Sequence, residues 1–419
     1  MLSALILSLA AQAVSDWLRT STIPLPAEGR MPAAVDSVFA GVRVLGLGEA
    51  THGQHESFEL KRRLTMHLVR EQGFRLVAYE ASSSRARACD DYVSGRSSDL
   101  KAAMSGLGMM IWNVKENEAL LEDLRAWNAA AAPADRVRFV GVDVQDADAA
   151  ARRLHDLLLK PEPELAAQAL LLGPRMETAR DALYRGQAAE FDALWAEIEQ
   201  LRAALQERHA TLATSTSRIV ADEALSRGRE LTRFMSAARV PSGRDRAMAE
   251  TLLEELAQAG EHSRAVLWAH NGHITIGPLR YLNVSDPGMG GVLRANLGDA
   301  YYAAGFLFGE GAFNALARDP ERGWEFRSYT LSAAPPQSLE APFLAARLAT
   351  SFVNLRNSPR AGEVSDWLDG AHGQRWFGGY GVPDDAEAQT RDAANLMKTS
   401  PRQDYDGLIY LPKTTPSRP

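Results

Sequence analysis

The amino-acid sequence predicts an α/β protein with a mainly parallel sheet flanked by helices. Five short apolar segments, rich in β-branched and aromatic residues, indicate buried strands at 42–48, 75–81, 137–144, 265–271 and 301–308. Segments with apolar residues three and four positions apart predict helices between them at 56–72, 116–132 and 244–260. Because strands and helices alternate along the chain, βα units in a single sheet account for the pattern.

Residues 147–236 interrupt this alternation. They are rich in Ala, Leu, Glu, Gln and Arg, and predict a long helix at 181–212 and another at 218–237. Their apolar spacing is too mixed for sustained heptads, which favours antiparallel helices over a coiled coil. We therefore predict an inserted helical sub-domain over the C-terminal ends of the strands.

This insertion divides the predicted catalytic core into residues 16–146 and residues 237–419. The second part contains many Gly, Pro and Arg residues after Gly309, a composition typical of long loops around small elements. The last eight residues, 412–419, are expected to form a frayed end.

Residues 1–15 form a candidate signal or leader segment. An apolar run ends in Ala11-Gln12-Ala13, the small-x-small pattern that precedes a cleavage site. The run is short and lacks a basic start, so an ordinary first helix is the alternative. The pattern slightly favours an exported or periplasmic location over a cytoplasmic one. Elsewhere no uncharged run approaches the ~18 residues that span a bilayer, so we expect no stable membrane insertion of the mature body.

The composition excludes several classes of function. The net charge of −7 argues against a nucleic-acid partner, because phosphate-binding surfaces carry an excess of basic residues. A single cysteine, Cys89, excludes an internal disulfide framework. The sequence contains neither G-x-S-x-G nor G-x-x-x-x-G-K-[ST], which argues against a serine-hydrolase elbow and against a P-loop.

Four of the predicted strands end in a polar side chain. These residues are Glu49, Glu80, Asp143 and His270. In open α/β sheets, ligands bind beyond the carboxyl ends of the strands. A single polar strand end is commonplace, but four in one sheet predict a shared pocket.

The segment after the first strand carries two further candidates. His52 lies in a turn near Gly48 and Gly53, where the backbone can bring a side chain close to a ligand, whereas Glu49 could equally cap the next helix. Lys61 falls within the apolar arc of that helix. It either snorkels to solvent or presents its ammonium group to a carboxylate or a developing oxyanion.

The segment WAHNGH places His270 and His273 three positions apart, so that both can face one cavity, and Asn271 could orient either ring. Together with His52 and a glutamate, these histidines would also suit zinc, but the chain has no H-E-x-x-H motif. We therefore expect no bound metal and no other cofactor, with a metal-dependent hydrolase as an alternative. Trp112 either shapes the pocket or packs in the core.

The candidate histidines and carboxylates are suited to activating a water molecule. A neutral histidine held by a carboxylate can take a proton from water near neutral pH, an effect worth ~10²–10⁴ in rate. Cationic or N–H donors can hold the resulting oxyanion. Ester hydrolysis suits this combination.

Several motifs together resemble the erythromycin esterase family. They are LGLGEATHG, the ELKRRL helix, LVREQGFRLVAYEA, MIWN, LRAWNA, VRFVGVDVQ and VLWAHNGH, and the resemblance extends from about Trp17 onward. It implies a metal-independent hydrolase that opens the lactone ring of macrolides, on an α/β core with an added helical region. The motif residues of the family correspond here to Glu49, His52, Glu80, His270 and His273.

This chain departs from the family at Lys61, where many members carry arginine, so that the charge is kept without bidentate geometry. The C-terminal part matches only loosely, through FLFGEGAF and DGLIYL.

From these observations we expect a carboxylic ester hydrolase that acts on a macrolide-type lactone or another small-molecule ester. His52 would act as general base on water, and Glu49 or Glu80 would fix its tautomer. The groups expected to stabilise the oxyanion or protonate the leaving alkoxide are His273, His270 and Lys61. The groups expected to bind substrate are Trp112, Asp143 and Asn271. A non-catalytic binding protein of the cell envelope is the other alternative.

Overall fold

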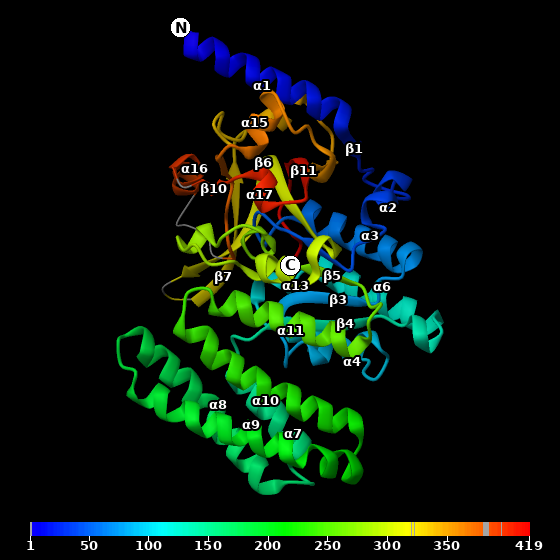
Figure 1. Ribbon diagram of the computed structural model, residues 1–419, viewed down its shortest axis with the longest axis vertical. Helices are drawn as coiled ribbons and strands as arrows, with labels where there is room; N and C mark the ends of the chain where they lie inside the picture. The colour runs from blue at the N-terminus through cyan, green and yellow to red at the C-terminus, as the bar shows by residue number, and fades with distance from the viewer. Residues whose placement is uncertain (1, 320, 322, 380–384, 395) are drawn as a thin grey trace.

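The computed structural model describes residues 2–319, 321, 323–379, 385–394 and 396–419. Within these residues, a nine-stranded sheet has the order β1-β8-β11-β6-β2-β5-β3-β4, and β7 pairs with β6 (Figure 1). The strands are β1 (Thr22–Pro24), β2 (Val44–Leu47), β3 (Leu76–Ser82), β4 (Arg138–Asp143), β5 (Ala265–Trp268), β6 (Tyr301–Asp319), β7 (Gly323–Leu331), β8 (Ser351–Asn354) and β11 (Gly407–Thr414). The run from β11 to β4 is parallel throughout, which confirms the predicted fold class.

Helices cover both faces of the sheet. Successive side chains of a strand point to opposite faces, and Leu45 and Leu47 of β2 accordingly belong to one cluster of buried residues while Val44 belongs to another. Helices α3 (His55–Gln72) and α6 (Lys115–Ala130) bury their apolar sides in the first cluster. Helices α11 (Gly243–Ala259) and α13 (Met289–Leu297) do so in the second. The predicted helices at 56–72, 116–132 and 244–260 therefore match α3, α6 and α11.

A bundle of four helices interrupts the α/β pattern. It comprises α7 (Ala147–Leu158), α8 (Pro163–Tyr184), α9 (Ala189–Ser215) and α10 (Arg218–Arg239), which share a cluster of buried side chains of their own. Figure 1 shows this bundle on the β4 side of the molecule, beyond α4 (Arg87–Val93) and α11. The predicted single helix at 181–212 is wrong, because the chain turns at Gly186, whose φ of 82° disfavours side chains other than glycine.

Helix α1 (Leu2–Ser21) lies at the opposite end of the molecule, against α14 (Ala341–Ala346) and α15 (Glu363–Asp369) (Figure 1). The helix is continuous through the predicted cleavage position at Ala13, and Val14 and Leu18 are buried. No helix among the described residues combines the length and the apolar character needed to cross a membrane.

The chain after Gly309 differs from the prediction in two places. Strand β6 continues to Asp319 and pairs with β7, so that a regular hairpin replaces part of the expected loop region. The frayed end expected at 412–419 is also wrong. Strand β11 continues to Thr414, and Ser417 N–H then donates a hydrogen bond of 2.9 Å to the carbonyl of Gly53. Residues 414–418 therefore pack against the turn that follows β2.

Short elements complete the described part of the chain. They are α2 (Ala33–Phe39), α5 (Leu100–Gly106), α12 (Asn271–Ile274), α16 (Asp385–Ala394), α17 (Pro401–Asp404), β9 (His372–Gln374) and β10 (Met397–Thr399).

Candidate active site

The four polar strand ends predicted from the sequence lie at one edge of the sheet, because β2, β5, β3 and β4 are consecutive and parallel. The pairing of β3 with β4 shifts register between Tyr79 and Ser82. Gly141 permits this irregularity, since a Cβ at that position would lie 2.5 Å from the carbonyl oxygen of Ser82. A bulge of this kind redirects the side chains near it, and Glu80 lies within the shifted part of β3.

His52, Glu49 and Lys61 form a buried chain of contacts. His52 Nδ1 lies 2.7 Å from Glu49 Oε2, and the ammonium group of Lys61 contacts Glu49 Oε1. Burial alone would raise the pKa of Glu49, but Lys61 and His52 together lower it below its usual value. An ionised Glu49 accepts a hydrogen bond from Nδ1–H and thereby leaves Nε2 of His52 as the basic nitrogen. Glu49, and not Glu80, thus sets the tautomer of His52.

Lys61 does not reach the cleft, which corrects its predicted contact with substrate. Its side chain is fully buried, and Nζ lies 4.5 Å from the centre of the Trp268 ring. Burial lowers the pKa of Lys61, and Glu49 opposes this effect. The sequence allowed Lys61 either to reach solvent or to present its ammonium group to a charged partner. The structure shows the second arrangement, with the carboxylate of Glu49 as the partner.

A second cluster surrounds His273. Its Nδ1 lies 2.9 Å from Asp245 Oδ1, and its Nε2 lies 3.2 Å from Glu80 Oε1. Arg244 donates hydrogen bonds of 2.8 Å to both Glu80 and Asp143, and its Nη1 lies 3.1 Å from His273 Nε2. Burial would lower the pKa of His273, but Asp245 and Glu80 raise it to about 10. A charged His273 lies close to the cation of Arg244. The three carboxylates around this pair, Glu80, Asp143 and Asp245, outnumber the two positive charges. We therefore take His273 as an imidazolium.

The same cluster holds Glu80 in its ionised form. Burial would raise the pKa of Glu80, but His273 and Arg244 lower it well below the usual value. Its second oxygen accepts a hydrogen bond of 2.9 Å from the backbone N–H of His270. Glu80 thus connects the ends of β3 and β5 and orients Arg244.

The polar side-chain atoms of His270 and Asn271 are hydrogen-bonded to the backbone. His270 Nε2 lies 3.1 Å from the carbonyl oxygen of Phe377, and its Nδ1 accepts a hydrogen bond from Gly272 N–H. Burial lowers the pKa of His270 to about 3, so the ring is neutral. Asn271 exchanges two hydrogen bonds with the backbone of Phe306 in β6, at 2.8 and 2.9 Å. These polar atoms therefore fix the backbone at the end of β5.

A cavity of about 380 Å³ opens beside this cluster. Glu80, Trp112 and Asp143 line it from the core, and Asp148 of α7 and Glu177 of α8 line it from the helical bundle. His52 does not itself line the cavity, but its ring meets the edge of Trp112 at a centroid distance of 5.5 Å. Trp112 is thus in contact with both the cavity and the candidate base.

Three residues of the site were absent from the sequence-based prediction. Arg244 and Asp245 begin α11, and the hydroxyl of Tyr281 donates a hydrogen bond of 2.8 Å to Asp245. One signal was present in the sequence. Arg244 lies in the first turn of a helix, where the helix dipole disfavours a positive charge, so a partner elsewhere was to be expected.

The three candidate histidines do not form a metal-ligand group with one another or with nearby carboxylates that the structure describes. Within the described part of the chain, no group of three or more His, Cys, Asp or Glu residues is arranged to hold a metal ion. His52 Nδ1, His270 Nε2 and His273 Nδ1 have different partners, namely a glutamate, a backbone carbonyl and an aspartate.

Comparisons with known proteins place this geometry in context. The family model described as erythromycin esterase matches residues 69–414. This range includes Glu80, Trp112, Asp143, His270 and His273, whereas the turn with Glu49 and His52 precedes it. A protein of Escherichia coli named erythromycin esterase type II is 21% identical over 356 residues, which are 77% of this chain and 83% of that protein.

Solved structures share the fold at low identity. A protein from Bacillus cereus superposes with a TM-score of 0.81 at 22% identity and covers 97% of this chain and 98% of its own. A protein named as a succinoglycan biosynthesis protein gives 0.79 at 18% identity, with the same coverage. An erythromycin esterase mutant in its open conformation gives 0.68 at 14% identity, covering 91% of this chain and 93% of its own. Because the family model spans most of the sequence, this chain belongs to the erythromycin esterase family.

Proposed function

We propose that this chain hydrolyses a carboxylic ester with His52 as the general base on water. Membership of the erythromycin esterase family supports an esterase-type hydrolase. The observation that carries the proposal is the contact of His52 Nδ1 with the ionised Glu49, because it leaves Nε2 basic. No hydrogen bond joins Nε2 to any described residue, so this nitrogen is available to a water molecule.

In the proposed reaction, Nε2 of His52 removes a proton from water while the water oxygen forms a bond to the ester carbonyl carbon. The carbonyl π electrons move onto oxygen, and Arg244 and the charged His273 stabilise this oxyanion. When the intermediate collapses, the bond to the leaving oxygen breaks and His52 returns its proton to the alkoxide. The products are a carboxylic acid and an alcohol, and Glu49 stabilises the transient imidazolium of His52.

For the substrate we propose a macrolide-type lactone or a related ester. The support is the name of the Escherichia coli relative, together with a cavity that is bordered by Trp112 and by polar groups. Trp112 and Asp143 line this cavity and would contact the substrate.

The test measures turnover of a panel of macrolides and simple aryl esters, with mass spectrometry to detect addition of water. We expect His52→Ala to abolish hydrolysis and to keep the circular-dichroism spectrum of the parent chain. His209→Ala is the matched control, because this histidine pairs with Asp222 in the helical bundle. Near-full turnover by His52→Ala would contradict the proposal. Activity that is lost with a chelator and restored by zinc would favour the metal-dependent alternative.

A further inference from the structure

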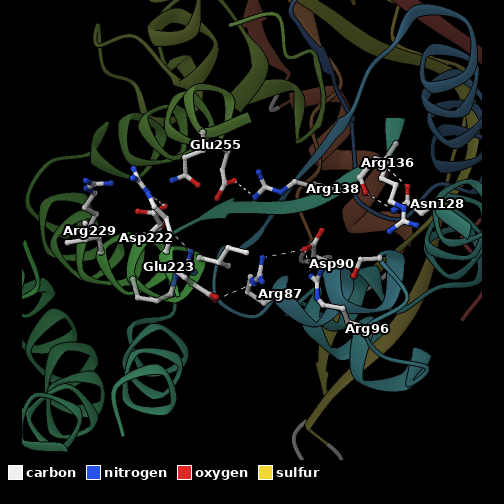
Figure 2. A pocket seen from close by; sticks show the side chains of 18 residues that line it. Arg87, Asp90, Arg96, Asn128, Arg136, Arg138, Asp222, Glu223, Arg229 and Glu255 are labelled. Atoms are coloured by element: carbon white, nitrogen blue, oxygen red, sulfur yellow. Dashed lines mark hydrogen bonds and ion pairs between the residues drawn. The ribbon is translucent and has the colours of Figure 1, made fainter. Parts of the chain in front are cut away.

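Two cavities lie at opposite ends of β4. The cavity at the start of β4 measures about 790 Å³ and its wall carries ion pairs, such as that of Arg138 with Glu255 (Figure 2). The cavity at the end of β4 is the active-site cavity of about 380 Å³. Trp112 lines this second cavity and also contacts His52, so a molecule bound in it lies near the candidate base.

Met109 and Trp112 connect the wall of the active-site cavity to the surroundings of His52. Both residues line the cavity, whereas His52 is only 6% exposed and does not line it. Met109 directly precedes the short 3-10 helix Met110–Trp112. Its side chain is half-buried and ends in a thioether, which has three rotatable bonds and adapts to its surroundings. Met109 is therefore the movable part of this wall.

Phe377 and Gly379 are held beside the candidate base by backbone hydrogen bonds. The N–H of Phe377 donates a hydrogen bond of 2.8 Å to the carbonyl of Ala50, which precedes His52 by two positions. The carbonyl of Gly379 accepts a hydrogen bond of 2.8 Å from the N–H of Leu316 in β6. Because both bonds join main-chain atoms, this part of the chain is a fixed neighbour of His52.

Gly379 leaves a space beside His52 that a side chain would fill. A Cβ atom at this position would lie 3.5 Å from Cδ2 of His52 and 3.2 Å from Cε of Met109. Cδ2 is bonded directly to Nε2, the nitrogen that acts as the base in the proposed reaction. The space is thus bordered by the candidate base and by a residue of the cavity wall. We call this space between Gly379, His52 and Met109 the glycine gap.

Trp112 supplies a hydrogen-bond donor without an acceptor close to the same place. It is 1% exposed, and its buried Nε1–H has no hydrogen-bond partner among the described residues. A buried donor is costly when it is left unpaired. A polar group of a bound molecule would remove this cost, and Trp112 contacts both the cavity and His52.

We propose that the substrate reaches Nε2 of His52 through the glycine gap, so that Gly379 and Met109 determine which esters react. This inference rests on the proposed function of His52. The side chain of Met109 can rotate away, whereas the backbone of Gly379 is fixed. The gap has the width of a methyl group before Met109 moves. It therefore admits an ester whose carbonyl carbon adjoins a small group and excludes one whose carbonyl carbon adjoins a quaternary carbon.

The first measurement follows access to Nε2 and needs no ester. Diethyl pyrocarbonate modifies an unprotonated imidazole nitrogen, and peptide mass spectrometry gives the rate at each histidine of the full chain. Gly379→Ala should slow the modification of His52 about tenfold, because an extra methyl group overfills the gap. Met109→Ala should speed it. His209 in the helical bundle should react at the same rate in every variant. Equal rates at His52 in the parent and in Gly379→Ala would overturn the proposal.

The neighbouring glycine provides a matched control. A Cβ atom at Gly378 would meet no other atom within 4 Å, so Gly378→Ala should leave the rate at His52 unchanged. Neither Gly378 nor Gly379 has a φ in the left-handed region, and alanine therefore suits both backbones. If Gly379→Ala does not fold by circular dichroism, Met109→Phe narrows the gap from the cavity side. An unchanged rate at His52 in that variant also overturns the proposal.

The second measurement compares the turnover of p-nitrophenyl acetate and p-nitrophenyl pivalate, whose acyl group contains a quaternary carbon. Pivalate esters are also less reactive in water, so the ratio of the two kcat/KM values is compared between variants. Met109→Ala should shift this ratio toward pivalate, and Gly379→Ala should shift it toward acetate. No turnover of either ester by the parent, with the expected rates at His52, contradicts the proposed hydrolysis but supports the route to Nε2. Turnover with the same ratio in all variants overturns the route alone.

Discussion

The ammonium group of Lys61 contacts the carboxylate of Glu49 inside the protein, where neither side chain reaches solvent. The other oxygen of Glu49 is 2.7 Å from His52 Nδ1, so one carboxylate serves a cation on one side and the candidate base on the other. In the proposed reaction Lys61 would therefore act through Glu49 as a positioning residue.

Replacing Lys61 with methionine should destabilise the fold. The variant leaves the Glu49 carboxylate buried without its cation, and breaking a buried ion pair costs roughly 3–5 kcal/mol. Urea denaturation measures the free energy of unfolding. The double variant Lys61→Met/Glu49→Gln should recover much of the loss, because it removes both charges. A single variant as stable as the parent would show that the pair contributes little.

Replacing Glu49 with glutamine should slow the reaction more than it weakens substrate binding. The neutral amide neither fixes the Nδ1–H tautomer of His52 nor stabilises its imidazolium, so kcat should fall by about 10²–10⁴ with KM nearly unchanged. Steady-state kinetics on the best ester of the panel provides the measurement. A rise in KM at constant kcat would instead place Glu49 in substrate binding.

The raised pKa of His273 should appear as a pH dependence of stability. Below pH 6.5 the ring is protonated in both the folded and the unfolded chain, and its stabilising effect is complete. Between pH 6.5 and about 10 only the folded chain keeps the proton, so this contribution is lost as the pH rises. We expect the difference in unfolding free energy between the parent and His273→Gln to shrink across this range. A difference that stays constant with pH would argue against a charged His273.

Removing residues 415–419 should destabilise the turn around His52. Ser417 N–H bonds to the Gly53 carbonyl, and Arg418 pairs with the buried Glu116. Each buried polar group left unpaired costs roughly 1–3 kcal/mol. The melting temperature and the rate of turnover should both be lower for the truncated chain than for the full chain. The same truncation in a Glu116→Gln background separates the loss of the ion pair from the loss of the backbone contacts. A truncated chain as stable as the full chain would contradict the packing.

The parallel core could be predicted because its local signals agree with its tertiary structure. Apolar runs between helical patterns identified β2, β3, β4 and β5, and their order explains why Glu49, Glu80 and Asp143 meet at one edge. The extension of β6 beyond Phe308 and its pairing with β7 escaped prediction because glycines at 309, 311 and 323 interrupt the sequence there, a composition also typical of loops.

The candidate site could be predicted only in part. Polar strand ends are visible in a sequence, but their partners are not. The contact of Arg244 with Asp143, for example, joins residues that the helical bundle separates in the sequence. His270 and Asn271 look like ligand-binding residues in the sequence, although their polar groups satisfy backbone atoms at the end of β5. The residue type at a strand end does not show whether its polar group binds a ligand or a backbone atom.

The contact of residues 414–418 with the turn after β2 also constrains when the site can form. The ribosome makes Glu49 and His52 well before Ser417, so a nascent chain carries the candidate base long before it carries the segment that packs on its turn. Strand β11 also lies inside the sheet, between β8 and β6, so these two strands have no common neighbour until it is made. An interrupted translation product therefore contains the His52 motif but cannot complete the surroundings that hold it.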